Sequence, residues 1–187
     1  MVDYNSAGPQ WSLIPDGTIV VVQMNIRSGN AGEGGLLKRS KSGEAEGLDT
    51  EFIVVEGEYA KRKIFSFMVL SGTTDGHEQA ADITRRRLRA IIESVKGIKP
   101  TDVSEDAKAK RNVEYAEFDG MRFLCRVGIE PARQLPNGES YRAKNILAEV
   151  ITPDQTKEWR PIEQAPKPPN GPSNAPTPII KPKWATS

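Results

Sequence analysis

The chain has 187 residues, a formal net charge of +1 and a hydrophobic fraction of 37%. That length allows one domain with a core of ordinary size, plus terminal extensions. The near-neutral charge excludes a protein coated with positive charge, so any surface that binds nucleic acid must be local. The single cysteine, Cys125, excludes an internal disulfide and favours a reducing compartment. Because the sequence shows neither a secretory leader nor an apolar run of about 18 residues, we expect a cytoplasmic protein.

Polar residues punctuated by glycine and proline predict an N-terminal arm over residues 1–12. Residues 18–27 then predict a first strand, because the run is apolar on both faces at its start and alternates between apolar and polar side chains at its end. Residues 28–47 are rich in glycine and carry Lys38, Arg39 and Lys41. A loop of this length in a compact domain is either functional or disordered.

The clearest signal is a β-hairpin. Two runs rich in Val, Ile and Phe, residues 48–56 and 63–70, flank a short turn that contains Gly57. This turn carries one tyrosine and a cluster of cations: Tyr59, Lys61, Arg62 and Lys63. The strands contain Phe52, Phe65 and Phe67. The last two are two residues apart and share a face, which is either core or a surface that stacks on bases.

A helix follows the hairpin. We expect it to start near His77 with Thr74 or Asp75 as its cap, and to end at Gly97. Its apolar residues recur at helical spacing and predict a stripe that packs on the strands: Ala81, Leu88, Ile91, Ile92 and Val95. Four arginines lie mostly off that stripe: Arg85, Arg86, Arg87 and Arg89. They either extend a binding groove or keep the outer helix face soluble, and we favour the second role.

Two more strands follow a polar excursion at residues 99–119. Residues 121–129 alternate, which turns their apolar side chains, Cys125 included, to one face and Arg122 and Arg126 to the other. A turn signal at 136–138 precedes the fifth strand, which we expect from about residue 143 to 151. A continuation of this strand as far as Trp159 is left open. The loop between these strands is flanked by Arg133, Tyr141, Arg142 and Lys144.

The order strand, strand, strand, helix, strand, strand is that of a small Greek-key barrel, an architecture often used to hold single-stranded nucleic acid. We therefore expect a mainly β fold with one helix, a five-stranded OB-fold Greek-key barrel over residues 13–160. The proline-dominated residues 161–187 predict a disordered tail.

The sequence offers no catalytic motif. His77 is the only histidine, and Cys125 lies on the expected inward face of a strand, where a packed thiol is expected rather than a nucleophile. One histidine and one cysteine cannot form the common zinc sites. The glycines of residues 29–35 lack the Gly-Lys-Ser/Thr of a phosphate-binding loop. We therefore expect no enzyme activity, no cofactor and no metal; a nuclease that holds a metal with carboxylates alone is the alternative.

A bound nucleic-acid strand needs cations for its phosphates and aromatic or arginine faces for its bases. In barrels of this type, the face of strands two and three and the loops after strands one and four hold the strand. The candidate binding residues fall in those places: Lys38, Arg39, Lys41, Tyr59, Lys61, Arg62, Lys63, Arg122, Arg126, Arg133, Tyr141, Arg142 and Lys144. Tyr59 and Tyr141, which lie near turns, are the aromatic residues that we expect to be exposed.

Residues 56–65, EGEYAKRKIF, resemble a hairpin of phage and prophage proteins that have a single-stranded-DNA-binding OB-fold. In that family a Gly-x-Tyr-x-Gly-Arg-Lys turn joins two strands, and Lys61 stands where the family often has glycine. The following helix is similar to the family's Arg-x-x-Leu-x-x-Ile helix in its Arg86, Leu88, Arg89, Ile91 and Ile92, which are followed by Val95 and Gly97. The resemblance covers about residues 13–152 and implies an OB-fold and a role in phage DNA replication, recombination or repair.

The C-terminal residues differ from those of many single-strand binders, which end in an acidic tail that recruits partners. This tail has Lys167, Lys181 and Lys183 against Glu163. We expect a sequence-nonspecific single-stranded-DNA-binding protein, with replication or recombination proteins as further partners through the tail. The alternative is an adaptor that uses the barrel or the Pro-rich tail, since such segments are preformed ligands for aromatic grooves. Exposed strand edges could also pair two copies, which leaves a homo-oligomer open.

Overall fold

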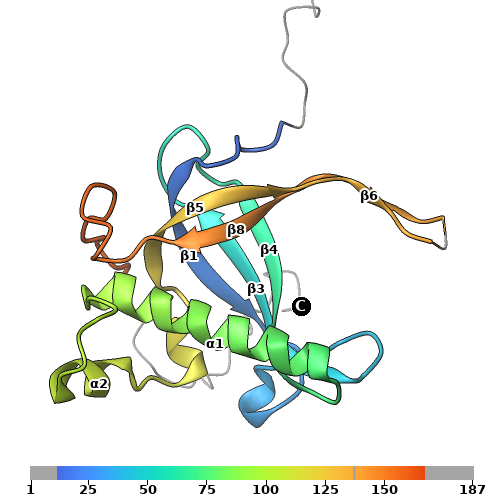
Figure 1. Ribbon diagram of the computed structural model, residues 1–187, viewed down its shortest axis with the longest axis horizontal. Helices are drawn as coiled ribbons and strands as arrows, with labels where there is room; N and C mark the ends of the chain where they lie inside the picture. Colours follow the sequence, from blue (N-terminus) through green and yellow to red (C-terminus); the bar gives the residue numbers. More distant parts are fainter. Residues whose placement is uncertain (1–11, 137, 167–187) are drawn as a thin grey trace, which may run out of the picture.

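The computed structural model describes residues 12–136 and 138–166. Its main feature is an antiparallel sheet of five long strands: β1 (Ile19–Arg27), β3 (Ala45–Val54), β4 (Lys63–Gly72), β5 (Arg122–Glu130) and β8 (Lys144–Val150). β3 pairs with β4 and β1, β1 with β5, and β5 with β8 (Figure 1). The short strand β2 (Lys38–Arg39) adds to β3, while β6 (Arg133–Gln134) and β7 (Ser140–Tyr141) form a separate ribbon. The predicted β-rich fold is confirmed.

β4 and β8 stand at the two ends of the strand order and approach each other in space. Within the described part of the chain no hydrogen-bonded ladder joins these two strands, and no closed barrel is found. The antiparallel sheet is thus a finding, and its closure into a barrel stays a prediction.

Helix α1 (Asp75–Lys96) runs beneath the strands and packs on β4, β5 and β8 (Figure 1). Both of its ends follow the sequence signals. The Thr74 side chain accepts a hydrogen bond from the His77 N–H at 3.3 Å, and Gly97 ends the helix with φ at +66°. Ala81, Leu88, Ile91 and Ile92 are buried and Val95 is partly buried, as the predicted stripe requires.

The expectation of a single helix is wrong, because residues 99–119 contain a second one. Helix α2 (Glu105–Arg111) is capped by the Ser104 side chain, which accepts from the Ala107 N–H at 3.2 Å. Acidic residues occupy its first turn and basic residues its last turn, which suits the helix dipole. Only Ala107 is buried, so the helix has no apolar stripe by which the sequence could reveal it. Two 3-10 segments, η1 (Glu33–Gly35) and η2 (Tyr115–Phe118), complete the elements.

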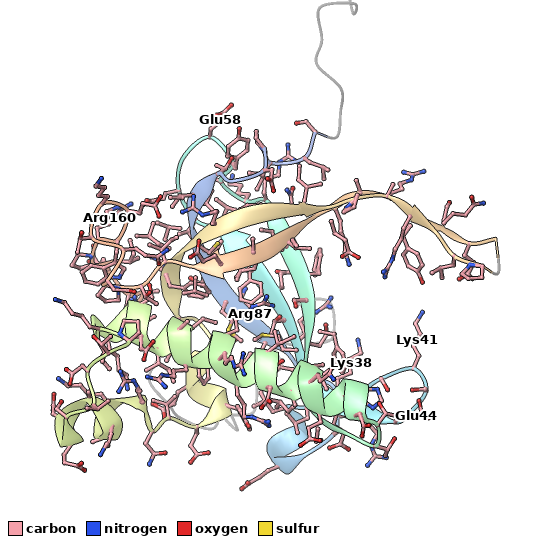
Figure 2. All side chains as sticks on the ribbon, viewed as in Figure 1. Lys38, Lys41, Glu44, Glu58, Arg87 and Arg160 are labelled. Carbon is pink, nitrogen blue, oxygen red and sulfur yellow. The ribbon has the colours of Figure 1, made fainter. Side chains whose placement is uncertain are left out.

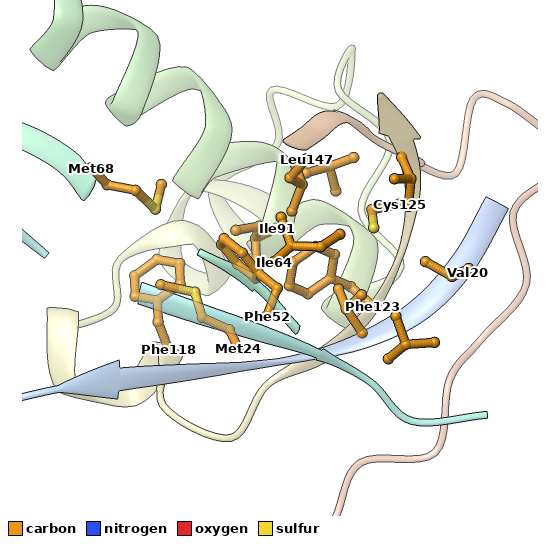
Figure 3. Close-up of a cluster of buried hydrophobic side chains, with 14 of the residues drawn as sticks. Val20, Met24, Phe52, Ile64, Met68, Ile91, Phe118, Phe123, Cys125 and Leu147 are labelled. Atoms are coloured by element: carbon orange, nitrogen blue, oxygen red, sulfur yellow. The ribbon is translucent and has the colours of Figure 1, made fainter. Parts of the chain in front are cut away.

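The core lies between the inner face of the sheet and α1 (Figure 3). Phe52 of β3 and Phe123 of β5 meet edge to face at its centre, with ring centroids 6.1 Å apart. Ile64, Ile91 and Leu147 pack around them from β4, α1 and β8. Alternation along each strand therefore fixes which side chains face the core and which face away from it.

The segment after β8 is not the strand that was expected as far as Trp159. It covers a second, smaller apolar cluster on the outer side of β1 and β5, formed by Val21, Leu124 and Ile151. The Trp159 Nε1–H donates to the Ser94 carbonyl of α1 at 3.2 Å, which fixes this segment. Its contacts extend past the predicted boundary at residue 160, because Gln164 exchanges two hydrogen bonds with the Arg122 backbone. The predicted arm up to residue 11 and the tail from residue 167 lie outside the described residues.

Candidate nucleic-acid interface

Four neighbouring strands, β4, β3, β1 and β5, turn one set of side chains away from the core, and we call this surface the outer sheet face. Residues directly opposite each other in an antiparallel ladder project to the same side. One row runs Arg27, Asp49, Phe67 and the next Asn25, Glu51, Phe65. A third row runs from Lys63 through Ile53 and Gln23 to Arg122. The outer sheet face thus consists of Gln23, Asn25, Arg27, Asp49, Glu51, Ile53, Lys63, Phe65, Phe67 and Arg122.

The aromatic side chains of this face are accessible. Phe65 is 50% exposed and Phe67 is 38% exposed, whereas Phe52 is fully buried. The Arg27 guanidinium lies over the Phe65 ring, 5.1 Å from its centroid. The open question of whether Phe65 and Phe67 are core or surface is therefore answered in favour of the surface.

The alternation of buried and exposed side chains along β4 could have predicted from the sequence that Phe65 and Phe67 are exposed. Phe65 and Phe67 share their parity with Lys63, which is exposed, while Ile64 and Met68 share the opposite parity and are buried. Ser66 has the buried parity and obscures the pattern. Its backbone carbonyl accepts a hydrogen bond from the Thr50 hydroxyl at 2.7 Å, which satisfies the buried hydroxyl of Thr50 on the inner side.

Asp49 of the outer sheet face binds two cations, Arg27 of the same face and Lys38 of β2. Arg27 Nη2 donates to Asp49 Oδ1 at 2.5 Å, and Lys38 Nζ donates to Oδ2 at 2.7 Å. Burial alone would raise the pKa of Asp49, but the hydrogen bonds and charges of Lys38 and Arg27 together lower it below its usual value. The Asp49 side chain is 11% exposed, while both cationic side chains are 48% exposed. Asp49 therefore holds two accessible cations, of which Arg27 lies over the Phe65 ring.

The glycine-rich loop is held together by its own backbone. Gly29 and Asn30 both donate to the Gly35 carbonyl, at 3.1 and 2.9 Å. A Cβ on Gly29 would lie 2.3 Å from the Cβ of Lys38, so this close approach requires glycine. Arg39 pairs with Glu46 at 2.9 Å. Lys41 is exposed and forms no ion pair with any described residue.

The second predicted cluster surrounds the β3–β4 turn. Tyr59, expected to be exposed, is partly buried and packs against the core. Lys61 is exposed at φ +72°, the backbone region that favours glycine. Arg62 donates to the Ser12 carbonyl at 2.7 Å, and Lys63 pairs with Glu51 at 3.1 Å.

The structure separates the loop cluster from the turn cluster. Figure 2 shows Glu58 at the tip of the turn and Lys38 and Lys41 at the other end of the hairpin. A ten-residue strand spans about 30 Å, which sets the distance between the two groups. The predicted cations therefore do not gather in one patch; the outer sheet face lies between them.

The two arginines of β5 have different surroundings. Arg122 belongs to the outer sheet face, where its Nε–H donates to the Gln23 amide oxygen at 3.0 Å. Arg126 pairs with Glu158 at 2.7 Å and with Glu149 at 3.0 Å, and these hydrogen bonds raise its pKa. Arg126 thus ties β5 to β8 and to the C-terminal segment.

The ribbon of β6 and β7 projects from the body at the end of the β5–β8 ladder (Figure 1). Its Arg133 guanidinium lies over the Tyr141 ring, 5.7 Å from the centroid, and Tyr141 is 51% exposed. Lys144 pairs with Glu130 at 3.0 Å. Arg142 is exposed and makes no ion pair within the described ranges. The four predicted residues of this loop are therefore brought together on one projecting element.

The helix arginines and the cysteine lie away from this face. Arg85 pairs with Asp82 on the surface of α1, and Arg89 pairs with the buried Glu93 at 2.8 Å. Cys125 is fully buried, as predicted, and burial raises its pKa to about 12. Its thiol therefore stays protonated at neutral pH.

No protein-family model matches the chain, and a search of curated proteins finds no significant match. Over residues 12–136 and 138–166, no group of three or more His, Cys, Asp or Glu side chains is placed to hold a metal ion. Neither α1 nor any other described helix has the length and apolar character needed to cross a membrane.

Proposed function

We propose that this protein has an OB-fold and binds single-stranded DNA through the outer sheet face, with little sequence preference and without catalysis. The strand order supports the fold part of the proposal. An OB-fold is a partly open five-stranded Greek-key barrel. Here the first strand pairs with both the second and the fourth, a helix connects the third to the fourth, and the third and fifth approach each other.

The observation that carries the binding part is the exposure of Phe65 and Phe67 beside cations. Phe65 and Phe67 lie next to each other on one face of β4 with polar and charged residues around them, and an exposed apolar patch with a polar rim is typical of an interaction site. Aromatic rings can stack on any base, and nearby cations neutralise phosphates, so the combination suits a strand of any sequence. Arg27 and Lys38 provide such cations on the same face.

Two projecting elements support the same interpretation. The loop with Lys41 and the ribbon with Arg142 each carry an exposed cation with no ion pair to a described residue. Loops at these two places in an OB-fold take part in binding oligonucleotides. The resemblance of the hairpin and α1 to those of phage proteins adds the context, which is DNA replication, recombination or repair.

Photo-crosslinking tests where a strand lies. A single strand of about 30 nucleotides with 5-iodouracil at several positions would be irradiated with the protein, and crosslinked peptides would be identified by mass spectrometry. The proposal expects crosslinks in β4, at Phe65 or Phe67, and in the ribbon at Tyr141. Crosslinks confined to α1 or α2, or none above the level of a duplex control, would contradict it.

A further inference from the structure

The helical side of the molecule contains a groove that the proposed DNA-binding face does not use. It has a volume of about 500 Å³ and lies between α1, α2, η2 and the chain that connects them. Its apolar lining consists of Leu88, Ile92, Val103, Val113, Tyr115 and Phe118. Leu88, Ile92 and Phe118 are buried and form the floor, whereas Val103 is 72% exposed and Tyr115 is 42% exposed. This volume suits one or two bulky apolar side chains.

The rim of the groove is positively charged. Its charged lining residues are Arg85, Arg89, Lys108 and Arg111, and no carboxylate belongs to the described lining. Arg89 and Arg111 both bind the same Glu93 oxygen at 2.8 Å, so two guanidinium groups face one carboxylate. Glu93 is 3% exposed and lies beneath the rim, and its single negative charge is outweighed by the two guanidinium groups that bind it.

The remaining two rim cations are available for a ligand. Arg85 pairs with Asp82, and Lys108 pairs with Glu105 at 2.6 Å. Both pairs are exposed and join residues three apart in a helix. Such pairs contribute roughly 0–1 kcal/mol, so an incoming carboxylate can replace either partner at little cost.

The walls of the groove are preorganised. Arg111 also donates to the carbonyls of Asp102 at 2.7 Å and Lys99 at 3.1 Å. Arg89 donates to the Pro100 carbonyl at 3.0 Å. These bonds anchor α2 and the connecting chain to α1, so little ordering remains to be done on binding.

We infer that this groove docks an acidic segment of a partner protein, with a bulky apolar side chain on the floor and carboxylates at the rim. Charge selects this occupant over the chain's own C-terminal segment, since residues 167–187 contain Lys167, Lys181 and Lys183 and no acidic residue. Four of the six apolar lining residues are aliphatic, and such a concave lining suits a protein side chain better than the flat face of a base. The inference is independent of DNA binding at the outer sheet face.

Selection from random peptides tests the groove and defines the sequence that it prefers. The full-length protein would be used to select from a phage-displayed library of random peptides of about twelve residues. The groove variant is Arg85→Glu with Lys108→Glu. The matched control is Arg86→Glu with Lys110→Glu, which makes the same charge change on the same two helices at residues outside the lining. Thermal unfolding followed by circular dichroism would establish that both variants fold.

We expect the selection to enrich peptides that combine Asp or Glu with Leu, Ile or Phe. In fluorescence anisotropy, a selected peptide should bind the groove variant at least about tenfold more weakly than the wild type and bind the control nearly as well as the wild type. Val103→Asp should give a similar loss. Three results would overturn the inference: enriched peptides without acidic residues, equal binding to both variants, or displacement of the peptide by single-stranded DNA.

Discussion

The two exposed phenylalanines of β4 provide a quantitative test of the proposed binding face. A base stacked on an aromatic side chain contributes about 1–3 kcal/mol. Phe65→Ala or Phe67→Ala should therefore weaken single-strand binding by about 5- to 150-fold. Truncation of a fully buried phenylalanine costs about 3–5 kcal/mol of stability. Because Phe65 is 50% exposed and Phe67 is 38% exposed, each variant should lose less than that and remain folded.

The salt dependence of binding separates stacking from phosphate contacts. A labelled single strand would be titrated by fluorescence anisotropy at several salt concentrations. Since a phenylalanine makes no ionic contact with a phosphate, Phe65→Ala should lower the affinity at every concentration and leave the slope of log K against log salt unchanged.

A matched aromatic control is Tyr115→Ala, because Tyr115 is 42% exposed but lies on the helical side. That variant should bind DNA like the wild type. If the double variant Phe65→Ala, Phe67→Ala folds and retains wild-type affinity, the assignment of β4 as a stacking surface is refuted.

Four further predictions concern charge and backbone. Replacing Lys38, Arg39 and Lys41 together by alanine should weaken single-strand binding and reduce its salt slope by about 0.7 for each phosphate that these side chains neutralise in the wild type. Asp49→Asn should instead tighten binding about two- to fivefold, because it removes the anion that neutralises two cations. The pKa of the Asp49 carboxyl is lower in the folded protein than its ordinary value of 3.8. Its ion pairs therefore stabilise the folded protein at pH values above 3.8, and this contribution disappears as the pH falls through the lowered pKa of the folded state. Lys61→Gly should be about 1 kcal/mol more stable than Lys61→Ala, because φ at this residue is +72°.

Fluorescence anisotropy titrations measure DNA binding by the triple alanine variant and by Asp49→Asn. Urea unfolding measures the pH dependence of the Asp49 contribution and the stability of the two Lys61 variants. An unchanged salt slope would remove the residue 28–47 loop from the site. Weaker binding by Asp49→Asn would mean that the carboxylate is needed to position its cations. The stability difference between wild type and Asp49→Asn should shrink below pH 3.8, and a constant difference would contradict the lowered pKa. Equal stability of the two Lys61 variants would show that the turn is not strained.

Most of the fold could be predicted because its signals are local. The spacing of Leu88, Ile91 and Ile92 indicates the buried stripe of α1, and Thr74 and Gly97 set its ends. Alternation along β5 correctly places Phe123, Cys125 and Val127 in the core. Helix α2 was missed because a seven-residue polar helix has caps and charges but no periodic apolar face.

The arrangement of the candidate site depends on contacts between distant residues. Asp49 contacts Arg27 and Lys38 because of the registers in which β3 pairs with β1 and β2. Neither register can be derived from the sequence of one strand alone. The same holds for Arg126, whose partners Glu149 and Glu158 lie 23 and 32 residues away. A sequence can supply candidate cations, but whether a carboxylate already binds each one depends on the tertiary structure.

The most direct measurement is fluorescence anisotropy of a labelled mixed-sequence single strand of about 30 nucleotides, with the matching duplex as control, at low and high salt. The account predicts tight binding to the single strand, weaker binding to the duplex, and a loss of affinity as salt rises. Equal affinity for strand and duplex, or no binding to the single strand even at low salt, would contradict it.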